Sequence, residues 1–201
     1  MMRNTQVELY RLLQERLDHP EKSNEIDRQI HATFNQDCAI LVLDLSGFSR
    51  LTIRYGIVHF LAMIYRMSAI ATPIVQQHQG RVVKQEADNL FATFAQVDWA
   101  VAAAIEIFQA FAAVNVDLTN DQDLYAGIGI GYGTTLIVGE EDLFGNEMNL
   151  ASKLGEDLAR QGEILLTEAA YRQLQPDENV WESLPLVISG LEIQAYKWLG
   201  K

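Results

Sequence analysis

Two aspartates stand at the ends of apolar segments, where a carboxylate can act on a ligand. Asp44 follows the apolar run Ala39–Leu43. Asp88 lies at the tip of a predicted hairpin whose strands are Val82–Lys84 and Leu90–Phe94. A carboxylate at the edge of a hydrophobic strand is costly unless a cation or a hydrogen-bonding turn receives it. If the strands are neighbours, the pair can hold one or two divalent cations together with substrate phosphates. The spacing equally allows Asp44 to cap the next helix and Asp88 to be a solvated turn residue.

A second polar group lies on the predicted helix 146–160. Asn149 and Lys153 are four residues apart, so their amide and ammonium groups share one helix face and can bind one anionic group. A solvated helix face shows the same spacing, because such pairs are common. Lys84 is near the hairpin tip, where a lysine also serves to cover a strand edge. Spacing alone leaves both interpretations open.

The elements that must position these residues alternate hairpins with helices. Thr5 and Glu8 have capping-box spacing and begin a helix over 5–18, which either docks on a partner or packs on its own domain. Pro73 should end or kink the helix that starts at Ile57. A hairpin turning at Gly133 is expected, with alternating glycines that allow another backbone to approach closely. This order predicts an antiparallel or mixed sheet with helices layered on one side. The expected segments are helices 5–18, 48–55, 57–72, 97–114 and 146–160, a short helix from 167, and strands 39–43, 82–84, 90–94, 125–132, 134–138, 163–166, 186–188 and 193–198.

Length and composition indicate one globular domain with a short appendage. The chain has 201 residues, 49% of them hydrophobic, which suffices for a full core. A formal charge of −12 argues against nucleic acid as a partner, because phosphate backbones need a basic face. The N-terminus lacks an apolar signal-peptide core, and Cys38 is the one cysteine, so we expect a cytoplasmic protein without membrane insertion. We divide it into a helical extension, 1–37, and a main domain, 38–201.

Four segments together resemble the class III nucleotidyl cyclase catalytic domain. They are LVLDLSGFS (41–49), VVKQEADNLFATF (82–94), GIGIGYGTTLIVG (127–139) and DLFGNEMNLASKL (142–154). The segments occur in the order and spacing of that family, and the resemblance covers about residues 38–198. It implies an α+β fold of ferredoxin-like or palm type, with a mixed, mostly antiparallel sheet and helices packed around it.

The resemblance also implies roles for individual residues. The two metal aspartates of the family match Asp44 and Asp88, which with the Leu45 carbonyl would hold two Mg²⁺ or Mn²⁺ ions per site. The adenine-reading lysine and aspartate match Lys84 and Asp142, a pairing that disfavours guanine because its edge reverses donor and acceptor.

The catalytic group would come from the helix. Asn149 matches the family's transition-state asparagine, and Lys153 would stabilise charge growing on the α-phosphate. We also place Phe48 among the substrate contacts. The implied activity is conversion of ATP to cyclic AMP and pyrophosphate by a homodimer. One subunit would supply the metal pair, and the other would supply Lys84, Asp142 and the helix residues.

Three departures favour a different outcome. The family usually has arginine at Lys153, glycine at Ala87 and a phosphate-binding lysine near 189–191. The alternative is therefore a degenerate cyclase-homology domain that binds a nucleotide or a partner as a regulatory module. A guanylate cyclase should instead carry glutamate at Lys84 and a small or thiol residue at Asp142. A diguanylate cyclase would need a Gly-Gly-acid-acid-Phe hairpin, which QEADNLF does not supply.

Overall fold

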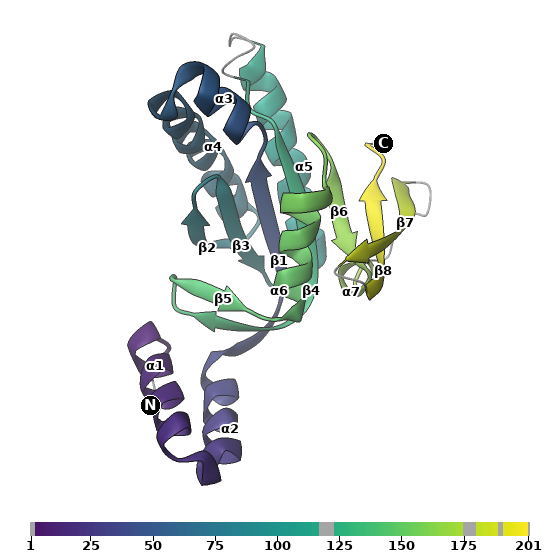
Figure 1. Ribbon diagram of the computed structural model, residues 1–201. Helices are drawn as coiled ribbons and strands as arrows, with labels where there is room; N and C mark the ends of the chain where they lie inside the picture. The colour runs from purple at the N-terminus through teal and green to yellow at the C-terminus, as the bar shows by residue number, and fades with distance from the viewer. Residues whose placement is uncertain (1–2, 117–122, 175–179, 189–190, 201) are drawn as a thin grey trace.

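The computed structural model describes residues 3–116, 123–174, 180–188 and 191–200. Two short N-terminal helices lie at one end of a large sheet, away from the other helices that cover it (Figure 1). The helices are α1 (Gln6–Asp18), η1 (Pro20–Lys22), α2 (Ser23–Phe34), α3 (Phe48–Tyr55), α4 (Ile57–Gln77), α5 (Val97–Asn115), α6 (Asn146–Ser152), the π-helical η2 (Lys153–Leu158) and α7 (Glu168–Tyr171). The strands are β1 (Asn35–Leu45), β2 (Arg81–Glu86), β3 (Asn89–Phe94), β4 (Ala126–Val138), β5 (Asp142–Phe144), β6 (Ile164–Thr167), β7 (Trp181–Ile188) and β8 (Leu191–Trp198).

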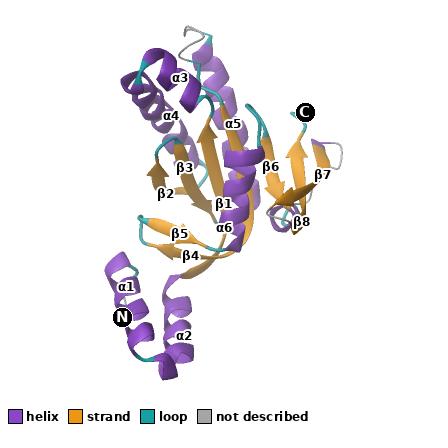
Figure 2. Ribbon diagram, viewed as in Figure 1, coloured by secondary structure: helices purple, strands orange, loops and turns teal. Residues whose placement is uncertain are grey.

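One mixed sheet organises the fold. Its strand order is β2-β3-β1-β4-β6-β8-β7, and β5 pairs with the far end of β4 (Figure 2). All neighbouring strands are antiparallel except β4 and β6. The α+β fold with a mixed, mostly antiparallel sheet is thereby confirmed. β1 lies inside the sheet with β3 on one side and β4 on the other, and Asp44 is near its end.

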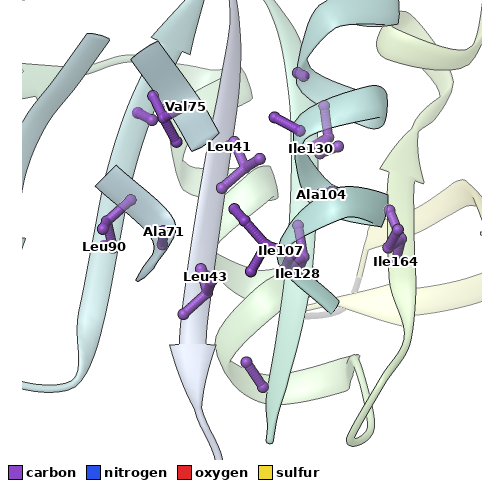
Figure 3. Packing of buried hydrophobic residues seen from close by; sticks show 14 of the residues in the cluster. Leu41, Leu43, Ala71, Val75, Leu90, Ala104, Ile107, Ile128, Ile130 and Ile164 are labelled. Carbon is purple, nitrogen blue, oxygen red and sulfur yellow. The ribbon is translucent and has the colours of Figure 1, made fainter. Parts of the chain in front are cut away.

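Alternate residues of β1 serve the two faces of the sheet, because successive side chains of a strand point in opposite directions. Leu41 and Leu43 belong to the main core with α4 and α5 (Figure 3). Ile40 and Val42 belong to a second cluster, which includes Ala151 of α6. Helices therefore lie on both faces rather than on one. Asp44 lies two residues after Val42 in β1, so its side chain is on the same face of the sheet, which is the face that carries α6.

The glycines of β4 seat α6 and η2 on the sheet. A Cβ atom at Gly129 would lie 2.1 Å from the carbonyl oxygen of Ala151, and one at Gly131 would lie 2.7 Å from that of Glu147. The expected close approach of another backbone is confirmed, and that backbone is the chain's own helix. The expected hairpin at Gly133 is wrong: β4 runs straight through this residue, because β1 pairs with it from Ala126 to Leu136.

The helices differ from the prediction in two places. The predicted end of the helix at Thr72 is wrong: α4 continues through Pro73 to Gln77, because Ile74 and Val75 are buried in the main core beyond it. That burial offsets the loss of one backbone hydrogen bond at the proline. Helix α2 was not predicted at all, since its apolar residues are few: Ile26, Ile30 and Phe34 are the buried ones.

The N-terminal helices form a small core of their own against β4. Leu9 and Leu12 of α1 pack with α2 and with Val138. Asn4 Oδ1 also accepts a hydrogen bond from the backbone N–H of Gly139 at 2.8 Å. One face of α1 thus packs within its own chain, while the division of the chain at residue 37 stays a prediction.

Helices α4 and α5 are long and apolar enough, by composition alone, to cross a membrane. Both contribute to the main core against the sheet. Core helices of a globular domain meet the same compositional test, so these helices do not establish membrane insertion.

Candidate functional site

Asp44 and Asp88 lie together where β1 ends and the β2–β3 hairpin turns. Asp44 is the strand partner of Asn89, and the Leu45 N–H donates a hydrogen bond to the Asp88 carbonyl oxygen at 3.2 Å. Burial, followed by the negative charge of Asp88, raises the pKa of Asp44 to about 7. The sequence left open whether the strands that carry these aspartates are neighbours, and the structure shows that β1 pairs with β3 of the hairpin.

Two further carboxylates near this pair were not identified from the sequence. The charges of Glu156 and Asp157, both in η2, also contribute to the raised pKa of Asp44. Burial raises the pKa of Glu156 itself. In the sequence, the only signal for these two carboxylates is that they follow Lys153 by three and four residues. That signal is useful only once it is known that this helix packs across β1.

The donor set fits a divalent cation held with a substrate. Asn89 Oδ1 is buried and has no hydrogen-bond donor, so an acceptor oxygen beside the two aspartates remains unsatisfied. No group of three or more His, Cys, Asp or Glu suited to a metal ion occurs within the described ranges. A cation here would rely on Asp44, Asp88, backbone oxygen and phosphate oxygens, which is the usual pattern for Mg²⁺.

Lys84 and Asp142 meet on the β2 and β5 strands. Lys84 Nζ lies 2.9 Å from Asp142 Oδ1 and 2.9 Å from Glu86 Oε2. The ammonium also lies 4.9 Å from the centroid of the Phe91 ring, and the side chain is only 19% exposed. Burial, the largest single effect, lowers the pKa of Lys84, but Asp142 and Glu86 more than compensate and the net shift is upward. The predicted lysine–aspartate pair is therefore a direct contact, and Glu86 is a partner that sequence reasoning missed.

Asn149 and Lys153 lie where α6 passes into the π-helical turn η2. Lys153 Nζ forms an ion pair with Asp157 Oδ2 at 2.6 Å, and both side chains are about half exposed. Within the described residues, neither the Asn149 nor the Lys153 side chain bonds to the aspartate pair or to Lys84. In one chain, therefore, Lys84 contacts Asp142 directly, whereas Lys153 bonds to Asp157, one of the carboxylates whose charge acts on Asp44.

Two predicted positions cannot be placed. Phe48 begins α3, but its side chain lies outside the described residues. The segment 189–190, where the family often has a lysine, also lies outside them.

Ala87 occupies the turn immediately before Asp88 with φ of 51°. This is the left-handed region that favours glycine, so the alanine is held there at a cost of about 1 kcal/mol. The alanine thus adopts the positive φ for which glycine is better suited.

β1 ends near Asp44, the β2–β3 hairpin places Asp88 beside it, and α6 packs on the same face of the sheet, as the resemblance to the nucleotidyl cyclase catalytic domain led us to expect. A family model described as the adenylate and guanylate cyclase catalytic domain matches residues 30–194. The chain belongs to this family.

Relatives support the same family. The chain is 33% identical over 133 residues to a putative adenylate cyclase of Rhizobium meliloti, covering 66% of this chain and 22% of that protein. It is 30% identical over 155 residues to an uncharacterised protein of Mycobacterium tuberculosis, covering 77% of this chain and 39% of the other. The chain thus spans well under half the length of either relative.

Solved structures agree on the fold. An adenylate/guanylate cyclase/hydrolase of Silicibacter pomeroyi superposes with a TM-score of 0.70 at 26% identity, covering 82% of this chain and 96% of that one. A bacterial light-regulated adenylyl cyclase gives a TM-score of 0.72 at 21% identity, covering 83% and 52% of the two chains. Solved structures of guanylyl cyclases are also similar, so the fold leaves the choice of base open.

Proposed function

We propose that this chain is an adenylate cyclase, which converts ATP to cyclic AMP and pyrophosphate as a homodimer with shared active sites. The observation that supports it best is the contact between Lys84 and Asp142. An ammonium donates to the ring nitrogen N1 of adenine, and a carboxylate accepts from its exocyclic amine. Guanine presents the opposite pattern, with a donor at N1 and an acceptor at O6, so the pair disfavours it.

The contacts of Lys84 suit recognition of adenine. Its ammonium has three N–H donors, and Glu86 and Asp142 engage two of them. One donor remains for adenine. Because the side chain is mostly buried against Phe91, the ammonium is already fixed in place before a nucleotide binds.

The reaction joins the ribose 3′-oxygen to the α-phosphorus and breaks the bond from that phosphorus to the bridging oxygen, so that pyrophosphate leaves. Mg²⁺ or Mn²⁺, two per site, would polarise the α-phosphate and acidify the 3′-hydroxyl. Asp44 and Asp88, with the Leu45 carbonyl, would hold these ions. Burial of Asp44 beside Asp88 supports this role, since the pair needs a cation to be ionised together.

The remaining groups would act on the ribose and the phosphates from the partner subunit. Asn149 would orient the ribose, and Lys153 would stabilise charge on the α-phosphate. Asp157 pairs with Lys153 in the single chain, and the other two donors of this half-exposed ammonium remain for a phosphate oxygen. We further propose that Phe48 contacts the substrate and that the enzyme is cytoplasmic.

The Lys153–Asp157 ion pair also favours a second candidate, a domain that binds nucleotide without turnover. Lysine lacks the planar fork of the usual arginine, and here its charge is already neutralised. The two candidates differ in one outcome: the degenerate domain binds ATP but releases no cyclic AMP.

Product analysis with ATP or GTP and Mn²⁺ tests the proposal. Cyclic AMP should form, with activity rising faster than linearly with protein concentration near the dimer dissociation constant. Asp44→Ala should abolish it, whereas Glu182→Ala, a change of an exposed carboxylate on β7, should not. No product from ATP, together with unchanged nucleotide affinity in Asp44→Ala, would reject the catalytic role.

A base-switch variant tests the lysine–aspartate pair separately. Lys84→Glu with Asp142→Cys should shift preference from ATP toward GTP, because the donor and acceptor are then exchanged. If the ratio of the two activities stays constant while total activity falls, the assignment of these residues to the base is wrong.

A further inference from the structure

One stretch of this acidic chain contains no acidic residue. Residues 45–85, from β1 to β2, hold five of the 15 Lys and Arg residues and none of the 27 Asp and Glu residues. This stretch therefore carries a net charge of +5, against −17 for the rest of the chain. Its middle forms α3 and α4, so the positive charge belongs largely to one part of the molecule.

The same two helices expose large apolar side chains. Ile53 of α3 is 87% exposed, and Val58 and Tyr65 of α4 are 76% and 78% exposed. Ile57 and Leu61 are exposed as well, and with Tyr65 they recur every four residues, so they share one face of α4. The opposite face of α4 is buried in the main core. A helix that is apolar on both faces normally has both faces covered.

The apolar and basic groups adjoin one another. Arg50 and Arg54 are four residues apart on α3, with Ile53 between them. Helices α3 and α4 lie side by side at the end of the molecule opposite the N-terminal helices (Figure 1), and the Tyr55 and His59 rings connect them with centroids 4.9 Å apart. Within the described part of the chain, no ion pair engages the guanidinium groups of Arg50 and Arg54.

We propose that this surface, formed by α3 and the first half of α4, docks on an anionic lipid bilayer. Exposed aliphatic and tyrosine side chains next to arginines are the composition of an interfacial helix, whose apolar face enters the headgroup region while its cations meet lipid phosphates. The bilayer core stays empty of protein, so this is adsorption and not insertion.

The combination of charge and apolar side chains favours a lipid surface. An acidic protein patch matches the single sign of charge on residues 45–85 equally well, but the exposed Ile53, Val58 and Tyr65 beside the arginines also match the headgroup region of an anionic bilayer, which takes up apolar and cationic side chains together. A uniformly anionic surface attracts this face and repels the remaining −17, which orients the molecule with α3 and α4 toward the lipid. Leu45, Phe48 and Lys84 of this stretch belong to the proposed catalytic site, so the proposal rests on Arg50, Arg54 and the exposed apolar residues of α3 and α4, and its test changes none of the proposed site residues.

Cosedimentation of the full chain with vesicles tests the proposal. Vesicles of phosphatidylcholine with phosphatidylglycerol should bind the protein, vesicles of phosphatidylcholine alone should not, and added salt should weaken binding. The double variant Arg50→Gln, Arg54→Gln should lower the partition coefficient about 25-fold, since each arginine contributes about fivefold. Ile53→Ser with Val58→Ser should also release the protein.

Matched variants on other faces provide the controls. Arg28→Gln with Arg160→Gln makes the same charge change, and Val116→Ser with Val187→Ser removes apolar side chains that are 83% and 69% exposed. Both should leave binding unchanged, and circular dichroism checks that all variants are folded. Equal binding to neutral vesicles, no binding to anionic ones, or equal losses in test and control variants overturns the proposal. The proposal is also overturned if the protein is an oligomer without lipid and the double variant Ile53→Ser, Val58→Ser dissociates it. The surface would then join two copies of the chain.

Discussion

Replacing Asp44 with asparagine should stabilise the metal-free protein, by an amount that grows with pH. Burial and the charges of Asp88, Glu156 and Asp157 raise the pKa of Asp44 from an ordinary 3.8 to about 7. The folded state therefore holds this proton more tightly than the unfolded state does. As pH rises from about 4 to about 7, the unfolded state ionises first, and the wild-type protein loses stability that the asparagine variant keeps.

The size of the effect follows from the pKa. A difference of about three pKa units corresponds to about 4 kcal/mol at about 1.4 kcal/mol per unit. Asp44 is only partly buried, and solvent screening reduces this to about 2 kcal/mol. For a chain of this size, about 2 kcal/mol shifts the melting temperature by roughly 4 to 8 °C.

Urea denaturation with a chelator present, at about pH 4 and about pH 8, measures the effect. The variant and the wild type should have similar free energies of unfolding at the lower pH and differ by about 2 kcal/mol at the higher one. Glu192→Gln, which changes an exposed carboxylate on β8, serves as the control and should show no such divergence. Adding Mn²⁺ at the higher pH should stabilise the wild type and not the Asp44 variant, because the cation binds the ionised pair.

Two results would refute this reasoning. If the pH curves of the variant and the wild type run parallel, the carboxyl group at Asp44 does not titrate in the folded protein as its surroundings require. If the variant is less stable at the higher pH, the ionised carboxylate makes favourable contacts that outweigh its burial, and the aspartate pair needs no cation.

Three further variants test separate features. Lys153→Arg should raise the rate of cyclic AMP formation by about tenfold or more, because the planar fork binds two phosphate oxygens; an unchanged or lower rate in the same assay contradicts the role of this cation. Ala87→Gly should raise the free energy of unfolding by up to about 1 kcal/mol, since φ at this residue is 51°; a less stable variant in urea denaturation would show that the turn is not strained. Gly129→Ala should lower the free energy of unfolding by about 3 kcal/mol, because its Cβ would lie 2.1 Å from the Ala151 carbonyl oxygen; a wild-type melting temperature would mean that α6 can lift off β4 at little cost.

Much of the fold was readable from the sequence because its signals are local. The apolar run before Asp44 predicted β1, and helical spacing predicted α5 within one residue of its observed end. Thr5 caps α1 as its spacing with Glu8 indicated, by accepting a hydrogen bond from the Glu8 N–H. Each of these features depends on residues within a few positions of one another.

The errors arose where distant packing outweighed a local signal. Pro73 is a helix breaker by itself, but the core beyond it continues α4. Gly133 is a turn residue by itself, but β1 holds it in a long strand. Helix α2 has a weak pattern by itself, and α1 and β4 complete its burial.

The candidate site shows the same division. Sequence alone determined which residue types are available: one aspartate after an apolar strand and one at a hairpin tip, a lysine near that tip, an aspartate before the helix 146–160, and an amide and a cation on that helix. Only the tertiary structure decided that Lys84 touches Asp142, that Glu86 shares its ammonium, and that η2 brings two more carboxylates near Asp44. The physical reason is that side-chain neighbours within one helix or strand follow from its periodicity. Side-chain contacts between different elements depend instead on strand register and on how closely the β4 glycines let a helix approach.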